Sequence, residues 1–227
     1  MTTTVPIEGR ILKENDRLAA DLRARFESAG LLCLNIISSP GSGKTTLLER
    51  TLRGLPDGTR AAVITGDIQT DNDARRIARA GYPVKQITTG GTCHLDASML
   101  TRALEGWDLD RLDLLFVENV GNLVCPTSFD LGEHKKIVLL SVTEGDDKPE
   151  KYPGIYRRAG LALITKSDLL PHVDFNVARA REHAQHIHPG LRHIVISCRT
   201  GDGLSEWQQW LAVRRAAVAV QPAGASE

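Results

Sequence analysis

Long apolar runs, an excess of one charge and abundant cysteine are all missing from this 227-residue sequence. No apolar stretch reaches the roughly 20 residues that span a bilayer, so a membrane-spanning helix is not expected. The 28 basic and 28 acidic residues balance, which argues against broad electrostatic binding to nucleic acid or to an anionic membrane. Four cysteines are too few for the disulfide framework of a small secreted domain.

The first ten residues also lack the basic stretch and apolar core of a secretory signal. These absences lead us to expect a soluble, cytoplasmic protein with reduced thiols and with no nucleic-acid or membrane partner. What is present, 41% hydrophobic and 25% charged residues, is typical of a globular chain with one folded domain.

Short apolar segments alternate with amphipathic helical patterns, which predicts an α/β fold. We expect a mostly parallel central sheet of about seven strands, flanked by helices on both faces. Strands are expected at residues 31–37, 60–65, 84–88, 112–118, 136–142, 161–165 and 193–197. Helices are expected at residues 45–55, 71–80, 95–105, 174–186 and 204–215.

The chain divides into three predicted parts. Residues 1–30 carry an amphipathic helical pattern and are expected to form a helical arm packed on the domain. Residues 31–215 form the domain itself. Residues 216–227 are small and polar and are expected to be a flexible tail.

A phosphate-binding loop follows the first predicted strand, in the segment Ser38-Ser-Pro-Gly-Ser-Gly-Lys-Thr45, and indicates a P-loop NTPase. Gly41 and Gly43 allow backbone N–H groups to form an anion-binding nest, and the following helix adds its partial positive charge. Lys44 is expected to reach the β- and γ-phosphates. Ser38 replaces the usual first glycine. The loop residues expected to contact the nucleotide are Gly41, Ser42, Gly43, Lys44, Thr45 and Thr46.

Two acidic residues stand at strand ends, where a P-loop site holds its magnesium ion. Glu118 ends one predicted strand, and Asp67 follows another. We expect Thr45, Asp67 and Glu118 to hold Mg²⁺, and Lys44, Asp67 and Glu118 to form the catalytic set. Gly121 is expected to let its loop approach the γ-phosphate closely and to contact the nucleotide.

Asp71 and Asp73 lie just beyond Asp67 and allow two interpretations. They can contact metal or orient the attacking water, or they can open a helix, where the helix dipole stabilises acidic residues. The sequence leaves both interpretations open, and it identifies no arginine finger.

Two further segments indicate that the base is guanine. Thr165-Lys-Ser-Asp168 is close to the Asn-Lys-x-Asp element of guanine-nucleotide proteins, with Thr165 expected to keep part of the asparagine's loop-bracing role. The Asp168 carboxylate can accept hydrogen bonds from the guanine ring N–H and exocyclic amine, and the Lys166 stem can lie along the base. In Ser197-Cys-Arg-Thr-Gly201 a backbone N–H can meet the guanine carbonyl. GTP or GDP is thus expected to be bound by Lys166, Asp168, Ser197 and Cys198.

Three residues suggest a second metal site. Cys93 and His94 are adjacent, and Cys125 lies seven residues beyond Glu118. Two thiolates and an imidazole suit Zn²⁺ or Ni²⁺ but leave a four-coordinate site incomplete. Two copies of the chain can complete the site across a symmetry axis, so metal binding is expected to accompany a homodimer. The alternative is that Cys93 and Cys125 are ordinary half-buried residues.

The remaining thiols and clustered histidines are interpreted as structural. Cys33 lies inside the first predicted strand, and Cys198 fills a position where alanine is usual. His183, His186 and His188 follow the pattern of a surface helix, and we expect no metal there.

Taken together, the motifs resemble those of the HypB-type GTPases, which take part in nickel insertion into nickel–iron hydrogenase. The resemblance is carried by the phosphate loop, by Cys93-His-Leu-Asp-Ala97 and by Glu118-Asn-Val-Gly-Asn-Leu-Val-Cys-Pro126. It implies GTP hydrolysis, with Cys93, His94 and Cys125 as Ni²⁺ or Zn²⁺ ligands at a nucleotide-sensitive dimer interface. It also implies a HypA-type nickel chaperone as partner and the hydrogenase large-subunit precursor as client.

Other functions compete with this one. The urease-type nickel GTPase is the nearest, but its metal string is Cys-Pro-His, unlike Cys93-His94. A metal sensor that binds GTP without turnover also fits, because hydrolysis depends on the placement of a water. In the HypB-type case, Gly121 and Cys125 share one loop, so nucleotide state is predicted to alter the distance of Cys125 from Cys93 and His94.

Overall fold

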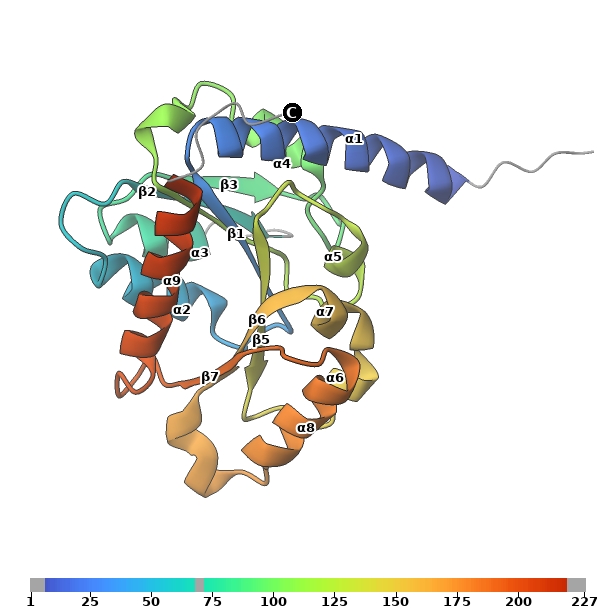
Figure 1. Ribbon diagram of the computed structural model, residues 1–227, viewed down its shortest axis with the longest axis vertical. Coiled ribbons are helices and arrows are strands. Elements are labelled where there is room, and N and C mark those ends of the chain that lie inside the picture. The colour runs from blue at the N-terminus through green and yellow to red at the C-terminus, as the bar shows by residue number, and fades with distance from the viewer. Residues whose placement is uncertain (1–6, 68–71, 220–227) are drawn as a thin grey trace, which may run out of the picture.

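The computed structural model describes residues 7–67 and 72–219, and the structural statements below concern these residues. Its centre is a seven-stranded sheet in the order β3-β2-β4-β1-β5-β6-β7, in which every neighbouring pair is parallel (Figure 1). The predicted α/β P-loop NTPase fold is therefore confirmed. The strands are β1 (Leu32–Ser38), β2 (Ala61–Asp67), β3 (Val84–Thr88), β4 (Leu114–Glu118), β5 (Lys135–Ser141), β6 (Ala159–Thr165) and β7 (His193–Ile196).

Helices cover both faces of the sheet. One face packs against α2, α3 and α9, and the other against α1, α4, α7 and α8 (Figure 1). The described helices are α1 (Ile7–Ser28), α2 (Lys44–Arg53), α3 (Asn72–Ala78), α4 (Ala97–Ala103), α5 (Cys125–Ser128), α6 (Lys148–Lys151), α7 (Pro153–Arg158), α8 (Val177–Ile187) and α9 (Leu204–Ala219), with short 3-10 helices at Leu109–Arg111 and Ser167–His172.

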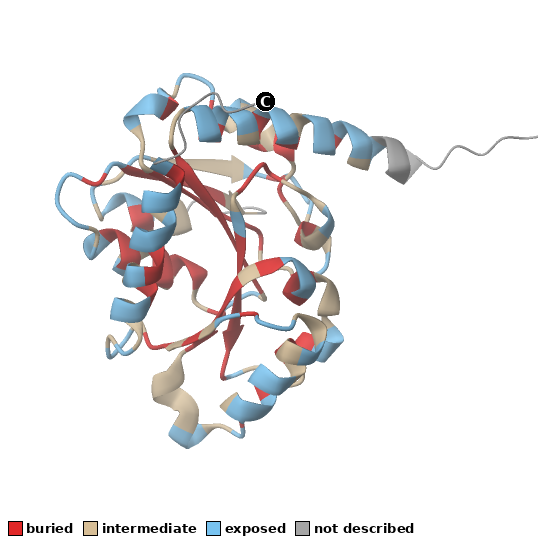
Figure 2. Cartoon of the chain, in the orientation of Figure 1, coloured by how far each residue is buried: buried red, intermediate tan, exposed pale blue. Residues whose placement is uncertain are grey.

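The central strand β1 shows why the sheet is the core of the molecule. All of its residues are buried, as expected for a parallel strand covered on both faces (Figure 2). Because side chains alternate, Leu34 faces the α2 and α9 side, where Trp207 is buried, while Cys33 faces the α1 and α4 side. The Trp207 indole N–H donates to Thr51 Oγ1 at 2.8 Å, so this large side chain is buried without an unpaired donor.

The helix α1 packs on the domain through one apolar stripe. Ala19, Leu22 and Phe26 are buried in the core on the α4 side of the sheet, while the rest of the helix surface is largely exposed (Figure 2). This spacing is that of an amphipathic helix laid against a core.

Some boundaries differ from the sequence-based expectation. The helix α9 continues to Ala219, with Val218 buried, so residues 216–219 belong to the domain and not to a tail. Residues 220–227 lie outside the described part of the chain. The short helices α5, α6 and α7 were not predicted, because helices of four to six residues are too short to show a period.

The strands β1, β2, β3 and β4 all end at the same edge of the sheet, which we call the carboxyl edge. The phosphate loop follows β1 there, residues 89–96 (the Cys93 loop) follow β3, and residues 119–134 (the Cys125 loop) follow β4. This is the edge at which open parallel sheets bind ligands. None of the described helices is long and apolar enough to cross a membrane.

Candidate functional site

The phosphate loop connects β1 to α2. Gly41 and Gly43 have φ angles of 73° and 98°, which residues with a Cβ rarely adopt, so the inward turn depends on glycine. Ser38 is instead the last residue of β1, and its hydroxyl accepts a hydrogen bond from Lys44 Nζ at 3.0 Å. The serine that replaces the usual glycine therefore helps to position the lysine of the loop.

A buried cluster joins the phosphate loop to the end of β4. Thr45 Oγ1 donates to Glu118 Oε1 at 2.7 Å, while Glu118 Oε2 is buried with no hydrogen-bond partner in the described part of the chain. Burial raises the pKa of Glu118 to about 7, although Lys44 and Thr45 oppose that rise. Burial also lowers the pKa of Lys44. A hydroxyl and a carboxylate with one free oxygen fit a magnesium ion.

A cleft of about 460 Å³ opens beside this cluster and is lined by the phosphate loop together with Asp67 and Asp73. Gly121 lies so close to the loop that a Cβ there would be 3.0 Å from the Cα of Pro40. A larger residue at 121 would displace the loop, so glycine allows the Cys125 loop to lie against it. Asp71, for which the sequence left two roles open, is outside the described residues.

Arg76 of α3 also lines the cleft and was missed by the sequence analysis. Its guanidinium donates to Thr46 Oγ1 at 3.2 Å and to Glu49 Oε2 at 2.7 Å. Arg76 follows Asp73 by one helical turn, so both side chains lie on the same face of α3. The three-residue spacing of Asp73 and Arg76, in the helix that follows β2, is the sequence feature that could have identified Arg76.

The predicted base-binding residues lie together beyond β6 and β7. Ser197 Oγ donates to Asp168 Oδ1 at 2.6 Å, and the Arg199 guanidinium lies 4.0 Å from Asp168 Oδ2. Lys166 has a φ of 59° and is the single non-glycine residue with positive φ in the described ranges. Such strain clusters at functional sites, and here it places Lys166 beside Asp168.

The phosphate loop is braced from the side of β5 and β6. Thr165 Oγ1 donates to the carbonyl of Ser42 at 2.8 Å, so the threonine in the usual asparagine position contacts the loop. Ser42 Oγ donates in turn to Glu144 Oε1 at 2.7 Å, and Lys148 pairs with Glu144 at 3.2 Å. Burial opposes ionisation of Glu144, but hydrogen bonds from Ser42 and its neighbours hold its pKa below the usual value. Sequence reasoning missed Glu144, because no spacing links it to the loop.

The predicted metal ligands converge where the Cys93 loop meets the Cys125 loop. Cys93 Sγ and Cys125 Sγ are 2.9 Å apart, and one ligand atom from each of Cys93, His94 and Cys125 lies within 4.8 Å of the others. Both thiols are free, and their hydrogen bond raises the pKa of Cys125. His94 Nδ1 is buried without a hydrogen-bond partner in the described part of the chain, and burial lowers the pKa of His94. An imidazole beside two thiols fits a borderline-soft cation such as Ni²⁺ or Zn²⁺.

Residues outside the motifs hold these two loops together. The Phe129 ring stacks on the His94 ring, with centroids 3.9 Å apart. Asn15 of α1 accepts a hydrogen bond from the Ala97 N–H at 2.8 Å and donates to the Asp130 carbonyl at 2.9 Å. The helical arm therefore contacts the Cys125 loop and the first residue of α4, which directly follows the Cys93 loop. These contacts join distant segments, and no local motif reveals them.

The other thiols and histidines lie elsewhere. Cys33 is fully buried in the core, as predicted. Cys198 packs partly against the core, and burial raises its pKa to about 11. In the described ranges, Cys93, His94 and Cys125 are the single group of three or more such residues with metal-binding geometry, so His183, His186 and His188 form no such group.

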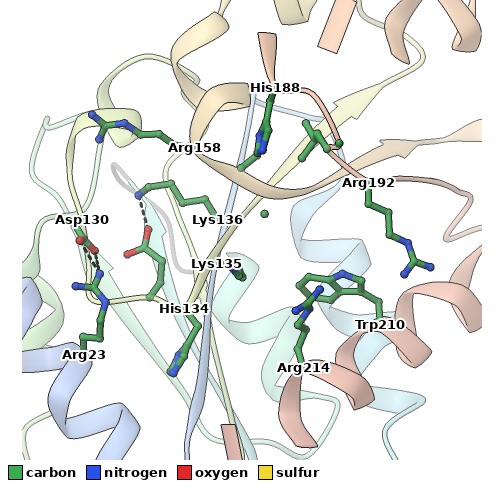
Figure 3. Close-up of a pocket in the computed structure, with 15 residues that line it drawn as sticks. Arg23, Asp130, His134, Lys135, Lys136, Arg158, His188, Arg192, Trp210 and Arg214 are labelled. Carbon is green, nitrogen blue, oxygen red and sulfur yellow. Dashed lines mark hydrogen bonds and ion pairs between the residues drawn. The ribbon is translucent and has the colours of Figure 1, made fainter. Parts of the chain in front are cut away.

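A larger cavity, of about 550 Å³, opens at the opposite edge of the sheet, where the strands begin (Figure 3). Three of its cations already have acidic partners, since Arg23 pairs with Asp130 at 2.7 Å, Arg192 with Glu206 at 2.8 Å and Lys136 with Glu133. None of its lining residues begins a described helix, so it lacks the N-terminal N–H groups that bind phosphate. The nucleotide site is therefore assigned to the smaller cleft.

The phosphate loop, the buried Thr45–Glu118 pair and the Asp168 carboxylate on a parallel sheet define a P-loop nucleotide-binding protein, and the adjoining thiols add a candidate metal centre. Residues 32–195 match the family model for the nucleotide-binding domain of CobW/HypB/UreG. The chain belongs to this family of metal-binding GTPases.

Individual relatives agree with this assignment. The hydrogenase maturation factor HypB of Azotobacter chroococcum mcd 1 is 53% identical over 215 residues, which cover 94% of this chain and 70% of the relative. The crystal structure of HypB from Helicobacter pylori in complex with nickel superposes with a TM-score of 0.85 at 40% identity, covering 90% of this chain and 96% of that one. HypB from Archaeoglobus fulgidus superposes with a TM-score of 0.83, also at 40% identity, covering 89% and 99%.

Proposed function

We propose that this protein is a GTPase that couples GTP binding and hydrolysis to nickel delivery during maturation of nickel–iron hydrogenase. The observation that carries the proposal is the continuity of one segment. Glu118, bonded to Thr45 of the phosphate loop, and Cys125, in contact with Cys93, are seven residues apart. A displacement of this segment on nucleotide binding reaches Cys125 directly. Similarity to HypB proteins, one of them solved with nickel, supports the choice of metal and process.

In this proposal the phosphate loop and Gly121 hold the triphosphate, and Lys44 stabilises the charge that develops on the γ-phosphoryl oxygens. Thr45, Asp67 and Glu118 are the residues that would hold Mg²⁺, which supplies further neutralisation of phosphate charge when bound. Glu118 Oε2, which is buried and has no partner among the described residues, is the oxygen that such an ion would satisfy.

Guanine selection is proposed for the residues beyond β6 and β7. Asp168 would accept from the guanine ring N–H and amine, while Ser197 orients the carboxylate through its 2.6 Å hydrogen bond. Lys166, whose backbone φ is 59°, would lay its stem along the base. A backbone N–H at Cys198 would meet the guanine carbonyl.

The metal cargo is proposed to bind Cys93, His94 and Cys125 as Ni²⁺, with Zn²⁺ as the alternative occupant. Binding requires deprotonated thiols, so the thiol protons leave as the metal enters. Because one chain supplies three ligands, a second copy is proposed to complete the coordination in a homodimer. A HypA-type nickel chaperone and the hydrogenase large-subunit precursor are the proposed partners, met in the cytoplasm, where thiols stay reduced.

A phosphate-release assay tests the catalytic part of this proposal. Wild-type protein with Mg²⁺ is expected to hydrolyse GTP in preference to ATP, and Lys44→Ala to release at most about one-hundredth as much phosphate. A wild-type rate equal to that of Lys44→Ala would instead support a metal sensor that binds GTP without turnover.

Metal analysis combined with the solution mass tests the second part. Protein loaded with nickel and a non-hydrolysable GTP analogue is expected to be dimeric, and Cys93→Ser protein to lose the metal. A nickel-loaded monomer in both nucleotide states would refute the shared site.

A further inference from the structure

The side chain of Asn119 occupies the junction between the two loops of the site. Asn119 follows Glu118 directly and is 1% exposed. Its Oδ1 atom accepts two hydrogen bonds, from the N–H of Val120 at 2.9 Å and from the N–H of Leu95 at 3.2 Å. One buried oxygen therefore contacts the Cys125 loop and the Cys93 loop together.

The two donors have different neighbours. Val120 lines the nucleotide cleft and precedes Gly121, which lies against the phosphate loop. Leu95 directly follows His94. The Leu95 side chain also lies against Gly66, where an added Cβ would be 2.8 Å from the Leu95 Cγ. A shift at the γ-phosphate end thus has a path of direct contacts to the backbone of His94.

The amide nitrogen of Asn119 is fixed on the other side by a buried polar chain. Asn119 Nδ2 donates to Asn35 Oδ1 at 3.2 Å, and Asn35 Nδ2 donates to Glu133 Oε1 at 3.2 Å. Glu133 pairs with Lys136, whose amine also donates to the Phe129 carbonyl at 2.9 Å. Figure 3 shows the Lys136 end of this chain. Asn35 lies in β1 and Lys136 in β5, so the amide nitrogen of Asn119 is tied to the central sheet while its oxygen contacts the two loops.

We propose that Asn119 is a positioning residue that transmits nucleotide state to His94 through the shared oxygen. The inference rests on the proposed coupling of GTP to nickel and names the side chain that carries it. When nucleotide draws Val120 and Gly121 toward the phosphate loop, the oxygen moves with them, and the Leu95 N–H follows it. The position of His94 relative to Cys93 and Cys125 changes as a consequence.

Nickel titrations of GDP-bound protein and of protein bound to a non-hydrolysable GTP analogue test this role, with nickel–thiolate absorption as the readout. We expect the two nickel affinities of wild-type protein to differ by about fivefold or more, as is typical of coupled sites. Asn119→Ala should bring their ratio to within about twofold of one, while GDP affinity stays within about threefold of wild type.

Asn122→Ala is the matched control. Asn122 is in the same loop, donates to the Cys93 carbonyl over 3.4 Å and bonds the Cys125 thiol, but no described contact links its side chain to the phosphate loop. Both nickel affinities should therefore shift together, and their ratio should persist. An Asn119→Ala protein that binds GDP and nickel and keeps the wild-type ratio would overturn the role of Asn119 and leave the proposed function standing. Equal affinities in wild-type protein would refute both. Should Asn119→Ala not fold, Asn119→Ser decides in its place, because a serine hydroxyl is too short to bridge both loops.

Discussion

Two glutamates are buried to a similar extent in this protein, yet their surroundings differ. Glu118 is 3% exposed and Glu133 is 6% exposed. Both oxygens of Glu133 have partners, since Oε1 contacts Lys136 and Asn35 and Oε2 accepts from the Leu131 N–H at 2.7 Å. Among the residues that the structure describes, Glu118 has one partner, Thr45, and its second oxygen has none. The hydrogen-bonding capacity of the Glu133 carboxylate is met within the protein, whereas the Glu118 carboxylate keeps an oxygen that a ligand can bind.

The difference in hydrogen-bond partners separates a structural glutamate, Glu133, from one at a candidate functional site, Glu118. A buried polar group without a partner costs free energy and is rare unless a ligand or a catalytic role explains it. Burial raises the pKa of Glu118 to about 7 beside the phosphate loop, and the orphaned His94 Nδ1 lies beside two thiols. Among the described residues, Glu118 Oε2 and His94 Nδ1 are thus unpaired atoms at the carboxyl edge, where the nucleotide and metal sites are proposed, whereas the unpaired nitrogens of His134 and His193 lie toward the opposite edge.

Breaking the buried ion pair of Lys136 and Glu133 should have the largest effect, and that effect is on stability. Lys136→Met leaves Glu133 charged and buried without its cation, so we expect the free energy of unfolding to fall by about 3–5 kcal/mol. Urea unfolding measures this loss. Lys135→Met is the matched control, because Lys135 is exposed and its replacement should stay within about 0.5 kcal/mol of wild type. Equal, small losses in both variants would show that the buried pair does not hold the fold.

Removing Lys44, which lies beside Thr45 and Glu118, should lower activity without lowering stability. Lys44→Ala is expected to slow GTP hydrolysis by about 10²–10³-fold, or roughly 2.7–4 kcal/mol in the barrier. Its thermal unfolding midpoint should stay at or above that of wild type, because Lys44 is buried and burial lowers its pKa. A fall in that midpoint as large as that of Lys136→Met would contradict the distinction between the two clusters.

A smaller effect is expected from the thiol cluster. Cys125→Ser should lower nickel affinity by at least about tenfold, roughly 1.4 kcal/mol, because a hydroxyl is a poor ligand for a soft cation. Competition with a chromophoric chelator measures this change. Cys198→Ala, which alters a thiol outside the cluster, should bind nickel as wild type does. Nickel affinity lowered equally by both substitutions would place the metal elsewhere.

The smallest effect concerns pH and a histidine of β7. Burial, with a contribution from Arg181, lowers the pKa of His193 to about 4 from its usual 6.5. The unfolded chain therefore takes up the proton first, and stability should fall as pH drops from 6.5 to 4. The loss should be about 1 kcal/mol, since the ring keeps partial contact with water. His193→Asn should reduce the slope of unfolding free energy against pH in this window, and an unchanged slope would rule out this histidine as its source.

The parts of the molecule that were predictable from the sequence are local. The phosphate loop, the Asp168 segment and the Cys93–His94 pair are continuous strings, and the seven strands are apolar runs long enough to recognise. Asn119 was not identified, because its role depends on the pairing of β4 with β1, which brings Asn35 within reach. Lys136 was likewise assigned only to a strand, since its partner Glu133 lies in a loop whose path the sequence does not reveal.

The coupling of nucleotide and nickel binding can be tested from the nucleotide side, because linked binding is reciprocal. The affinities for GDP and for a non-hydrolysable GTP analogue are measured by titration with and without saturating nickel. If one segment serves both sites, nickel must change the ratio of these two affinities, and we predict a change of about fivefold or more. A ratio that nickel leaves unaltered would contradict the coupling of nucleotide and metal.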